Sequence, residues 1–272
     1  MRAPTDGMRE LIAFYLDAGV DVFLGEQPTD RLAADETVRR PAGMPAPPCE
    51  VAGARSPVTR AAISAAAPAA PEAAIMAARE AAKAAQTLEE LRALLDAFEG
   101  CMLRASATQL VFAAGNPQAP VMLVGEAPGR DEDIAGQPFV GRSGQLLDRM
   151  LAAIGLDRSN VYIANVVPWR PPGNRTPTPQ ETAICLPFIR RQIELADPDI
   201  LVCLGQPSTQ ALLGTKEGIS RTRGRWFKFD TGRREIRALA TYHPAFLLRS
   251  PLQKRLAWRD FLALKQALDR AT

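Results

Sequence analysis

Short apolar runs alternate with longer amphipathic segments through the second half of the chain. Four short apolar runs predict strands: VMLVG at 121–125, VYIANVV at 161–167, ILVCLG at 200–205 and IRALATY at 236–242. Helical spacing marks three segments between or after them: 143–156, 179–196 and 206–214. Strands that alternate with helices predict an α/β fold, with a mostly parallel sheet covered by helices on both faces.

The first third of the chain has a different pattern. Residues 1–35 hold one amphipathic stretch, MRELIAFYLDA at 8–18, and predict a separate helical arm. Residues 36–86 are rich in alanine and proline with few large apolar side chains, which predicts a flexible linker with one alanine-rich helix near 75–86. A capping box, TLEE at Thr87, begins the next helix. We therefore expect the folded domain to span 87–272.

Charge and cysteine content narrow the class of protein. The 272 residues carry a net charge of only +3, but residues 219–272 hold 13 Lys and Arg against 4 Asp and Glu. Such a segment can follow a phosphate backbone, although a solvated basic face explains it equally well. We find no signal-peptide pattern, no apolar run of membrane-spanning length and no C-x-x-C pair. A cytoplasmic protein with reduced thiols is expected.

Candidate chemistry lies directly after the predicted strands, because ligands bind at the carboxyl ends of parallel strands. The first strand leads into GEAPGRDEDIAGQPFVGRSG at 125–144, which contains Glu126 and Phe139 and lacks the G-K-[ST] of a P-loop. Asn165 ends the second strand, and the only histidine of the chain, His243, comes after the fourth. A lone histidine is most often structural. Its convergence with a carboxylate, an aromatic ring and an amide favours a small-ring pocket instead.

These motifs, with LVCLGQPSTQALLG, SRTRGRW and TYHPAFLLR in the same order, resemble family 4 uracil-DNA glycosylases of the bacterial iron–sulfur type. The resemblance covers about residues 87–265. It implies a three-layer α/β/α sandwich with a central, mostly parallel four-stranded sheet, and removal of uracil from DNA in base-excision repair. By the same resemblance, Glu126 and His243 are catalytic, and the substrate-binding residues are Gly125, Ala127, Phe139 and Asn165.

The resemblance also implies a surface for DNA. Phe246 or Leu247 would be the apolar wedge that fills the duplex where the uracil has flipped out. The expected DNA-binding residues are Arg170, Arg175, Arg221, Arg223, Phe246, Leu247, Leu248 and Arg249.

The chain departs from the family at the metal cluster. Members of this type hold a [4Fe–4S] cluster with four cysteines, and here Phe98 and Trp169 occupy two of those positions while Cys101 and Cys185 occupy the others. A cubane cluster normally needs four thiolates. We therefore expect no iron–sulfur cluster and no other metal, with the two aromatic side chains packed in its place and the two cysteines close together as free thiols.

Three functions remain open at this point. The first is a monofunctional uracil-DNA glycosylase, active on single- or double-stranded DNA and monomeric by default. The second is a weakly catalytic or product-retaining protein that binds uracil or abasic DNA. The third, a small-molecule nucleosidase, is disfavoured because a free nucleoside needs neither a basic segment nor an apolar wedge.

Overall fold

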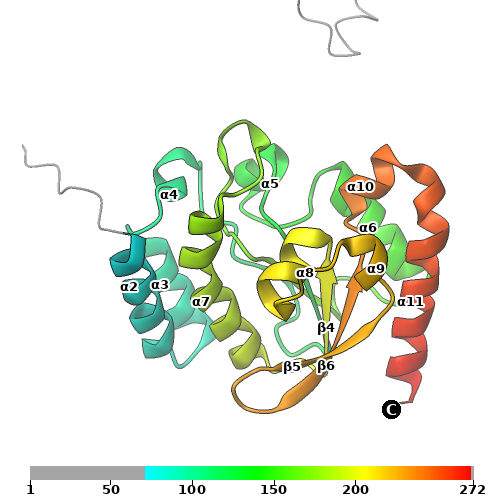
Figure 1. Cartoon of the computed structure of the whole chain (residues 1–272). Coiled ribbons are helices and arrows are strands. Elements are labelled where there is room, and N and C mark those ends of the chain that lie inside the picture. The colour runs from blue at the N-terminus through cyan, green and yellow to red at the C-terminus, as the bar shows by residue number, and fades with distance from the viewer. Residues whose placement is uncertain (1–70, 271–272) are drawn as a thin grey trace, which may run out of the picture. The chain divides into compact units, whose positions relative to one another are not determined.

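The computed structural model describes residues 71–270, which contain one sheet flanked by helices (Figure 1). The six strands of this region lie in the order β1-β3-β2-β4-β6-β5. The four central strands are parallel, and β1 and β5 pair antiparallel at the two edges. The expected α/β sandwich with a mostly parallel sheet is confirmed, since the four central strands are the four predicted from the sequence.

Six strands and ten helices make up the described region. The strands are β1 Ala114–Gly115, β2 Val121–Gly125, β3 Tyr162–Asn165, β4 Ile200–Leu204, β5 Trp226–Asp230 and β6 Glu235–Thr241. The helices are α2 Pro71–Ala84, α3 Leu88–Ala97, α4 Leu103–Ser106, α5 Arg130–Ala135, α6 Arg142–Ala152, α7 Pro179–Ala196, α8 Gln206–Leu213, α9 Ile219–Thr222, α10 Pro244–Arg249 and α11 Lys254–Asp269, with 3-10 turns at Pro172–Asn174 and Pro251–Gln253.

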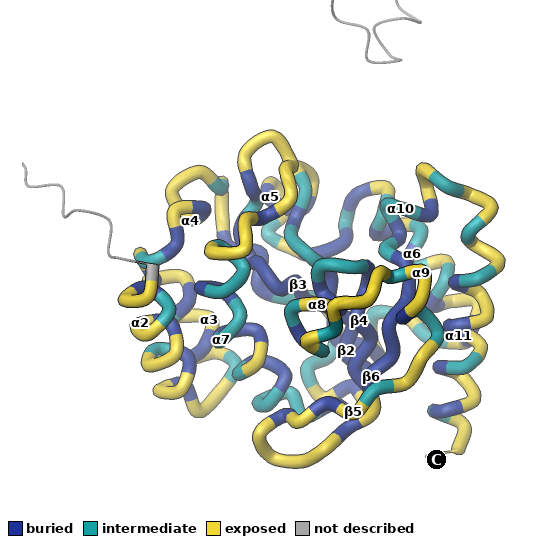
Figure 2. Tube along the Cα trace, in the orientation of Figure 1, coloured by how far each residue is buried: buried dark blue, intermediate teal, exposed yellow. Residues whose placement is uncertain are grey.

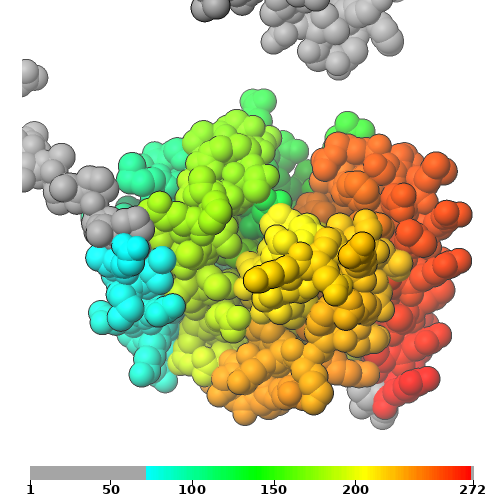
Figure 3. All heavy atoms as spheres, viewed as in Figure 1, coloured from blue at the N-terminus to red at the C-terminus, as the bar shows by residue number. Residues whose placement is uncertain are grey.

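Alternate residues of each central strand serve opposite layers of the core. Met122 and Val124 of β2 pack with α2, α3 and α7, whereas Val121 and Leu123 pack with α6 and α11. This two-residue period is the geometry of a strand that is covered on both faces, and it explains why these runs are apolar throughout. Figure 2 shows the central strands as buried, and Figure 3 shows α2 and α11 on opposite sides of the molecule.

The alanine-rich helix belongs to the folded domain, although the sequence pattern placed it in the linker. α2 packs against α7, and four alanines at helical spacing are buried: Ala74, Ala78, Ala82 and Ala85. Arg191 of α7 donates from Nε and Nη2 to the carbonyl of Ala85, at 3.0 and 2.6 Å. Small side chains allow the two helices to approach closely, so a segment without large apolar residues still contributes to the core. The predicted arm at 1–35, and the linker before residue 71, lie outside the described residues.

The structure also tests the predicted helix cap at Thr87 and the number of predicted strands. Thr87 caps α3 as predicted, since its Oγ1 accepts from the amide of Glu90 at 3.1 Å. Neither edge strand was predicted, so the sheet has six strands where four were expected. Strand β1 is only two residues long, and β5 is mostly exposed. No helix within residues 71–270 has the length and apolarity needed to cross a membrane.

Candidate active site

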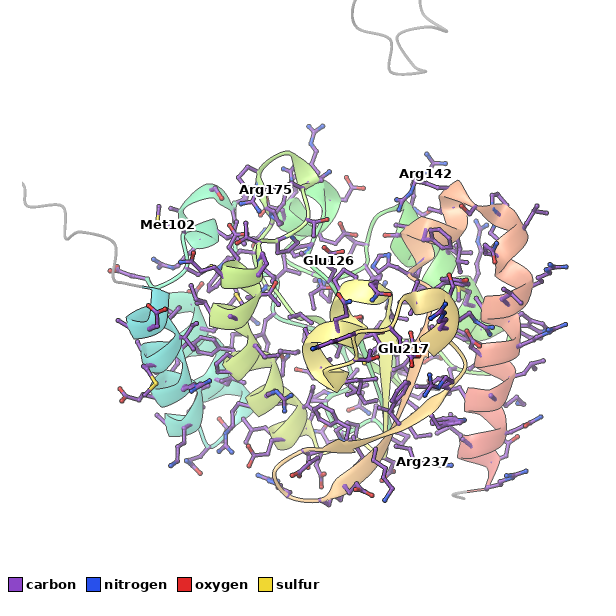
Figure 4. The ribbon with its side chains drawn as sticks, in the orientation of Figure 1. Met102, Glu126, Arg142, Arg175, Glu217 and Arg237 are labelled. Atoms are coloured by element: carbon purple, nitrogen blue, oxygen red, sulfur yellow. The ribbon has the colours of Figure 1, made fainter. Side chains whose placement is uncertain are left out.

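The carboxyl edge of the sheet holds a cavity of about 320 Å³. Parallel pairing sets Gly125, the last residue of β2, opposite Asn165, the last residue of β3. The turn after β6 brings His243 to the same edge. The side chains around the cavity include Glu126, Phe139, Asn165, Thr176, His243 and Arg249. In Figure 4 Glu126 lies above the strands, below Arg175 and Arg142. The predicted convergence of these strand-end residues is therefore found in the structure.

Two buried acceptor atoms at this edge have no hydrogen-bond partner. They are Oε1 of Glu126 and Oδ1 of Asn165, and they are the only such side-chain atoms among the residues that the structure describes. Buried polar atoms in native proteins are nearly always paired, and an unpaired one carries a desolvation cost of about 1–3 kcal/mol. The cavity therefore offers two acceptors to a ligand that brings its own donors.

Burial also changes the acidity of Glu126. Desolvation raises the pKa of its carboxyl above the ordinary value, and a hydrogen bond from the Thr176 hydroxyl opposes the rise. Thr176 belongs to the Pro-rich loop after β3 and was not singled out in the sequence. Nothing in a linear pattern links it to Glu126, which lies 50 residues earlier.

His243 is held as a neutral imidazole of defined tautomer. It is the N-cap of α10, and its Nδ1 accepts a hydrogen bond from the amide of Ala245 at 3.1 Å. Nδ1 is therefore unprotonated, and the single proton resides on Nε2. Burial and the nearby positive charge of Arg249 lower the pKa of His243 to about 4. At neutral pH the ring is an uncharged donor at the cavity.

Phe139 gives the cavity an aromatic wall. Its ring is buried and lies 5.4 Å from the imidazole of His243, centroid to centroid, with the two planes inclined by 32°. Gly125 allows this arrangement, because a β-carbon added there would lie 2.5 Å from Oδ1 of Asn165 and 2.7 Å from Cζ of Phe139. Gly125 was predicted to bind substrate, and its contribution would be to leave room for the side chains of Asn165 and Phe139. Ala127 lines the cavity directly.

Two acidic residues of the glycine-rich loop are buried and support the loop. Glu132 accepts from the amides of Gly129 and Gly141, at 3.1 and 2.9 Å, and so joins the start of α5 to the start of α6. Asp133 accepts from the amide and hydroxyl of Thr108, both at 2.8 Å. From sequence these acids could be solvated; in the structure they shape the loop that carries Phe139.

The arginines expected to bind DNA differ in whether their side chains are already paired within the protein. Arg221 is exposed. Arg170 bonds Oδ1 of Asn174 at 2.7 Å, and Arg175 is paired with Glu181 at 2.6 Å. Arg223 is paired with the buried carboxylate of Asp260, which favours a structural role for it. That these four side chains contact DNA stays a prediction.

The wedge segment on α10 is corrected in one respect. Leu247 is fully buried against Tyr242 and Ala257, so it cannot enter a duplex in this conformation. Phe246 is half-buried and stacks on Tyr242, at 4.9 Å between ring centroids. Leu248 is 36% exposed and lies beside the exposed Arg249. The helical turn of α10 points these neighbours in different directions, which the apolar triplet alone did not reveal.

Comparison with known proteins agrees with this architecture. The model of the uracil DNA glycosylase superfamily matches residues 112–262, more than half of the chain. The chain belongs to this superfamily. A type-4 uracil-DNA glycosylase of Archaeoglobus fulgidus is 39% identical over 180 residues, which cover 65% of this chain and 90% of that protein. One from Thermotoga maritima is 43% identical over 151 residues, 55% of this chain and 77% of the relative. The resemblance to family 4 is confirmed.

The residues at the cluster positions of family 4 do not fit a [4Fe–4S] cluster. Phe98 and Trp169 are buried in the core, and the Phe98 ring meets that of Phe188 edge-on, with centroids 5.1 Å apart. The two remaining cysteines are in contact: a hydrogen bond between Cys101 and Cys185 lowers the pKa of Cys101 and, with burial, raises that of Cys185. Two thiols cannot supply the four bonds that such a cluster needs.

No other cysteine of the described region replaces the missing ligands. Cys203 lies inside β4, where burial raises its pKa to about 12. Cys49 lies outside the described residues. Within residues 71–270 no group of three or more His, Cys, Asp or Glu side chains could hold a metal ion.

Proposed function

We propose that the chain is a monofunctional uracil-DNA glycosylase. It would hydrolyse the N-glycosidic bond of a flipped-out deoxyuridine in single- or double-stranded DNA, as the first step of base-excision repair. One observation carries the proposal: a single cavity presents two unpaired acceptors, Glu126 and Asn165, beside a neutral histidine donor and an aromatic face.

Recognition of uracil is explained by the hydrogen-bonding groups. Oδ1 of Asn165 can accept from N3–H of uracil while the amide of the same side chain donates to O4. Cytosine has an acceptor at N3 and an amine at position 4, so both contacts would be mismatched. A mismatch leaves the buried Asn165 oxygen unpaired, which is how a polar site rejects a near-identical ligand. Phe139 offers a face on which the extruded base can stack.

Bond cleavage uses the remaining two groups. When the C1′–N1 bond breaks, its electron pair stays on uracil and positive charge develops on the sugar. Nε2–H of His243 can donate to O2 of uracil and stabilise the anion. The Glu126 carboxylate can stabilise the cation, orient a water molecule and accept its proton as the water oxygen bonds to C1′. The uracil anion then takes up the proton that Glu126 received from water, so the products are uracil and an abasic site with a hydroxyl at C1′.

Partner and location are parts of the same proposal. DNA is the macromolecular substrate, and the basic residues of 219–272 would screen its phosphates. We infer a cytoplasmic location, because Cys101, Cys185 and Cys203 are free thiols, and we propose that the protein acts as a monomer.

Single-turnover excision tests the proposal. Enzyme in excess is mixed with a single-stranded oligonucleotide that carries one uracil, and abasic product is cleaved with alkali; a cytosine oligonucleotide is the matched control. Release of uracil with no release of cytosine is expected. Tight binding of uracil or abasic DNA without excision would favour the binding protein instead, and cleavage of free deoxyuridine would favour a nucleosidase.

The pH dependence of excision should follow Glu126. Because burial raises its pKa, the rate constant should fall as pH decreases through a value above 4.5, the ordinary pKa of a glutamate side chain. His243, with a pKa of about 4, is mostly neutral at the midpoint of that limb. Glu126→Gln should lower the rate and abolish the acid limb. An unchanged limb in Glu126→Gln would assign the titration to another group.

We further propose that the active protein contains no iron–sulfur cluster. Anaerobically purified protein should lack stoichiometric iron and any cluster absorbance in the visible range. The double variant Cys101→Ala/Cys185→Ala should keep its excision rate within about twofold, since the thiols ligate nothing. Stoichiometric iron in wild type, lost together with activity in the double variant, would overturn this proposal.

A further inference from the structure

Phe139 has an unfavourable backbone conformation, and its buried ring forms a wall of the cavity. Its φ is +57°, in the left-handed region, and its side chain is only 4% exposed. For a residue other than glycine this conformation costs about 1–2 kcal/mol. Such a conformation persists only where surrounding contacts impose it.

Arg158 supplies those contacts from outside the cavity. It lies in the loop between α6 and β3, 19 residues after Phe139. Its Nη2 donates to the Phe139 carbonyl, and its Nη1 donates to the Pro138 carbonyl at 3.3 Å. Its Nε donates to Oδ1 of Asp148 on α6, at 2.9 Å. The planar guanidinium therefore joins two successive carbonyls of the loop to a helix.

The backbone of α6 also packs against this carbonyl. A β-carbon added at Gly144 of α6 would overlap the Phe139 carbonyl oxygen, so the helix backbone packs directly on this peptide. The hydrogen bonds of Arg158 and the close packing at Gly144 together fix the position of the Phe139 peptide. Because the ring touches the Gly125 region and stands 5.4 Å from His243, its tilt depends on that placement.

We propose that Arg158 is a positioning residue for the uracil-stacking ring of Phe139. The inference rests on the proposed function, since stacking presupposes a flat base in the cavity. Arg158 does not line the cavity and acts only through Phe139. Losing it releases the peptide toward ordinary backbone geometry and turns the ring away from the base.

A double-mutant cycle between Arg158→Met and Phe139→Ala tests this. Arg158→Met should reduce single-turnover excision at subsaturating enzyme by about tenfold to a hundredfold, the range for an ångström-scale misplacement. In the Phe139→Ala background the same change should have almost no further effect, since the ring is already gone. Arg158→Lys should recover only part of the loss, because an ammonium cannot bridge both carbonyls and Asp148.

Arg234→Met is the matched control. Arg234 also joins backbone carbonyls to carboxylates, with bonds of 2.9 Å to Asp197 O and 2.8 Å to Asp197 Oδ1. It lies in the turn between β5 and β6, and Asp197 lies just before β4, at the opposite edge of the sheet from the cavity. It should cost comparable stability and leave excision unchanged in both backgrounds. If Arg158→Met does not fold, Arg158→Lys takes its place in the cycle.

Amide hydrogen exchange gives a second readout that does not need excision. Arg158→Met should speed exchange across residues 136–144 by about tenfold or more, and Arg234→Met should not. Additive effects in the cycle, or unchanged exchange in 136–144, would overturn the role of Arg158. Absence of excision in wild type would instead overturn the proposed function, and the exchange measurement would still decide on Arg158.

Discussion

Replacing His243 with alanine is expected to slow uracil excision by about 10²–10³-fold in single turnover, the usual loss on removing one such donor. The Ala245 amide fixes the imidazole proton on Nε2, and a pKa of about 4 keeps the ring uncharged. A neutral donor needs no proton from solvent and is already aimed at the oxygen where charge develops. The rate constant at saturating enzyme is the quantity to compare.

The affinity for uracil-free DNA separates this effect from a loss of binding. It should change little in His243→Ala, because the imidazole lines the cavity that would hold the extruded uracil. His243→Gln, whose amide can still donate, should recover part of the rate. A rate loss below about tenfold in the alanine variant would exclude His243 as the principal donor to uracil.

Replacing Gly125 with alanine is expected to reduce excision by about 10²-fold or more while the protein remains folded. The added β-carbon would lie 2.5 Å from Oδ1 of Asn165 and 2.7 Å from the Phe139 ring, closer than real contacts allow. One or both groups must move, and an ångström of displacement at a reactive site costs about 10²-fold. Excision rate and melting temperature should be measured together.

Gly218→Ala is the control for this substitution. Gly218 has no heavy atom within 4 Å of an added β-carbon, and its φ is −69°, so alanine fits there without strain. It should excise uracil at the wild-type rate. Equal rates for Gly125→Ala and wild type would show that the contacts at the end of β2 are not required.

The central strands of the sheet and the residues that follow them could be predicted from the sequence, because both depend on short local patterns. Strands buried on both faces need continuous apolar runs, and a parallel sheet gathers the residues after its strands at one edge. That reasoning located Glu126, Asn165 and His243 from the sequence pattern. It missed the edge strands β1 and β5, because one has two residues and the other is mostly exposed. It left α2 in the linker because alanine carries little apolar signal.

Other features depended on contacts between distant segments. The buried position of Leu247, the pairing of Arg223 with Asp260 and the hold of Arg158 on Phe139 each join residues without a common sequence pattern. The four central strands and the strand-end chemistry can be read from the order of residues along the chain, and the lack of two cluster ligands follows from the resemblance to family 4. Which side chains are free, which are paired and how the ring of Phe139 is held can be read only from the folded molecule, because burial and hydrogen bonding depend on three-dimensional neighbours.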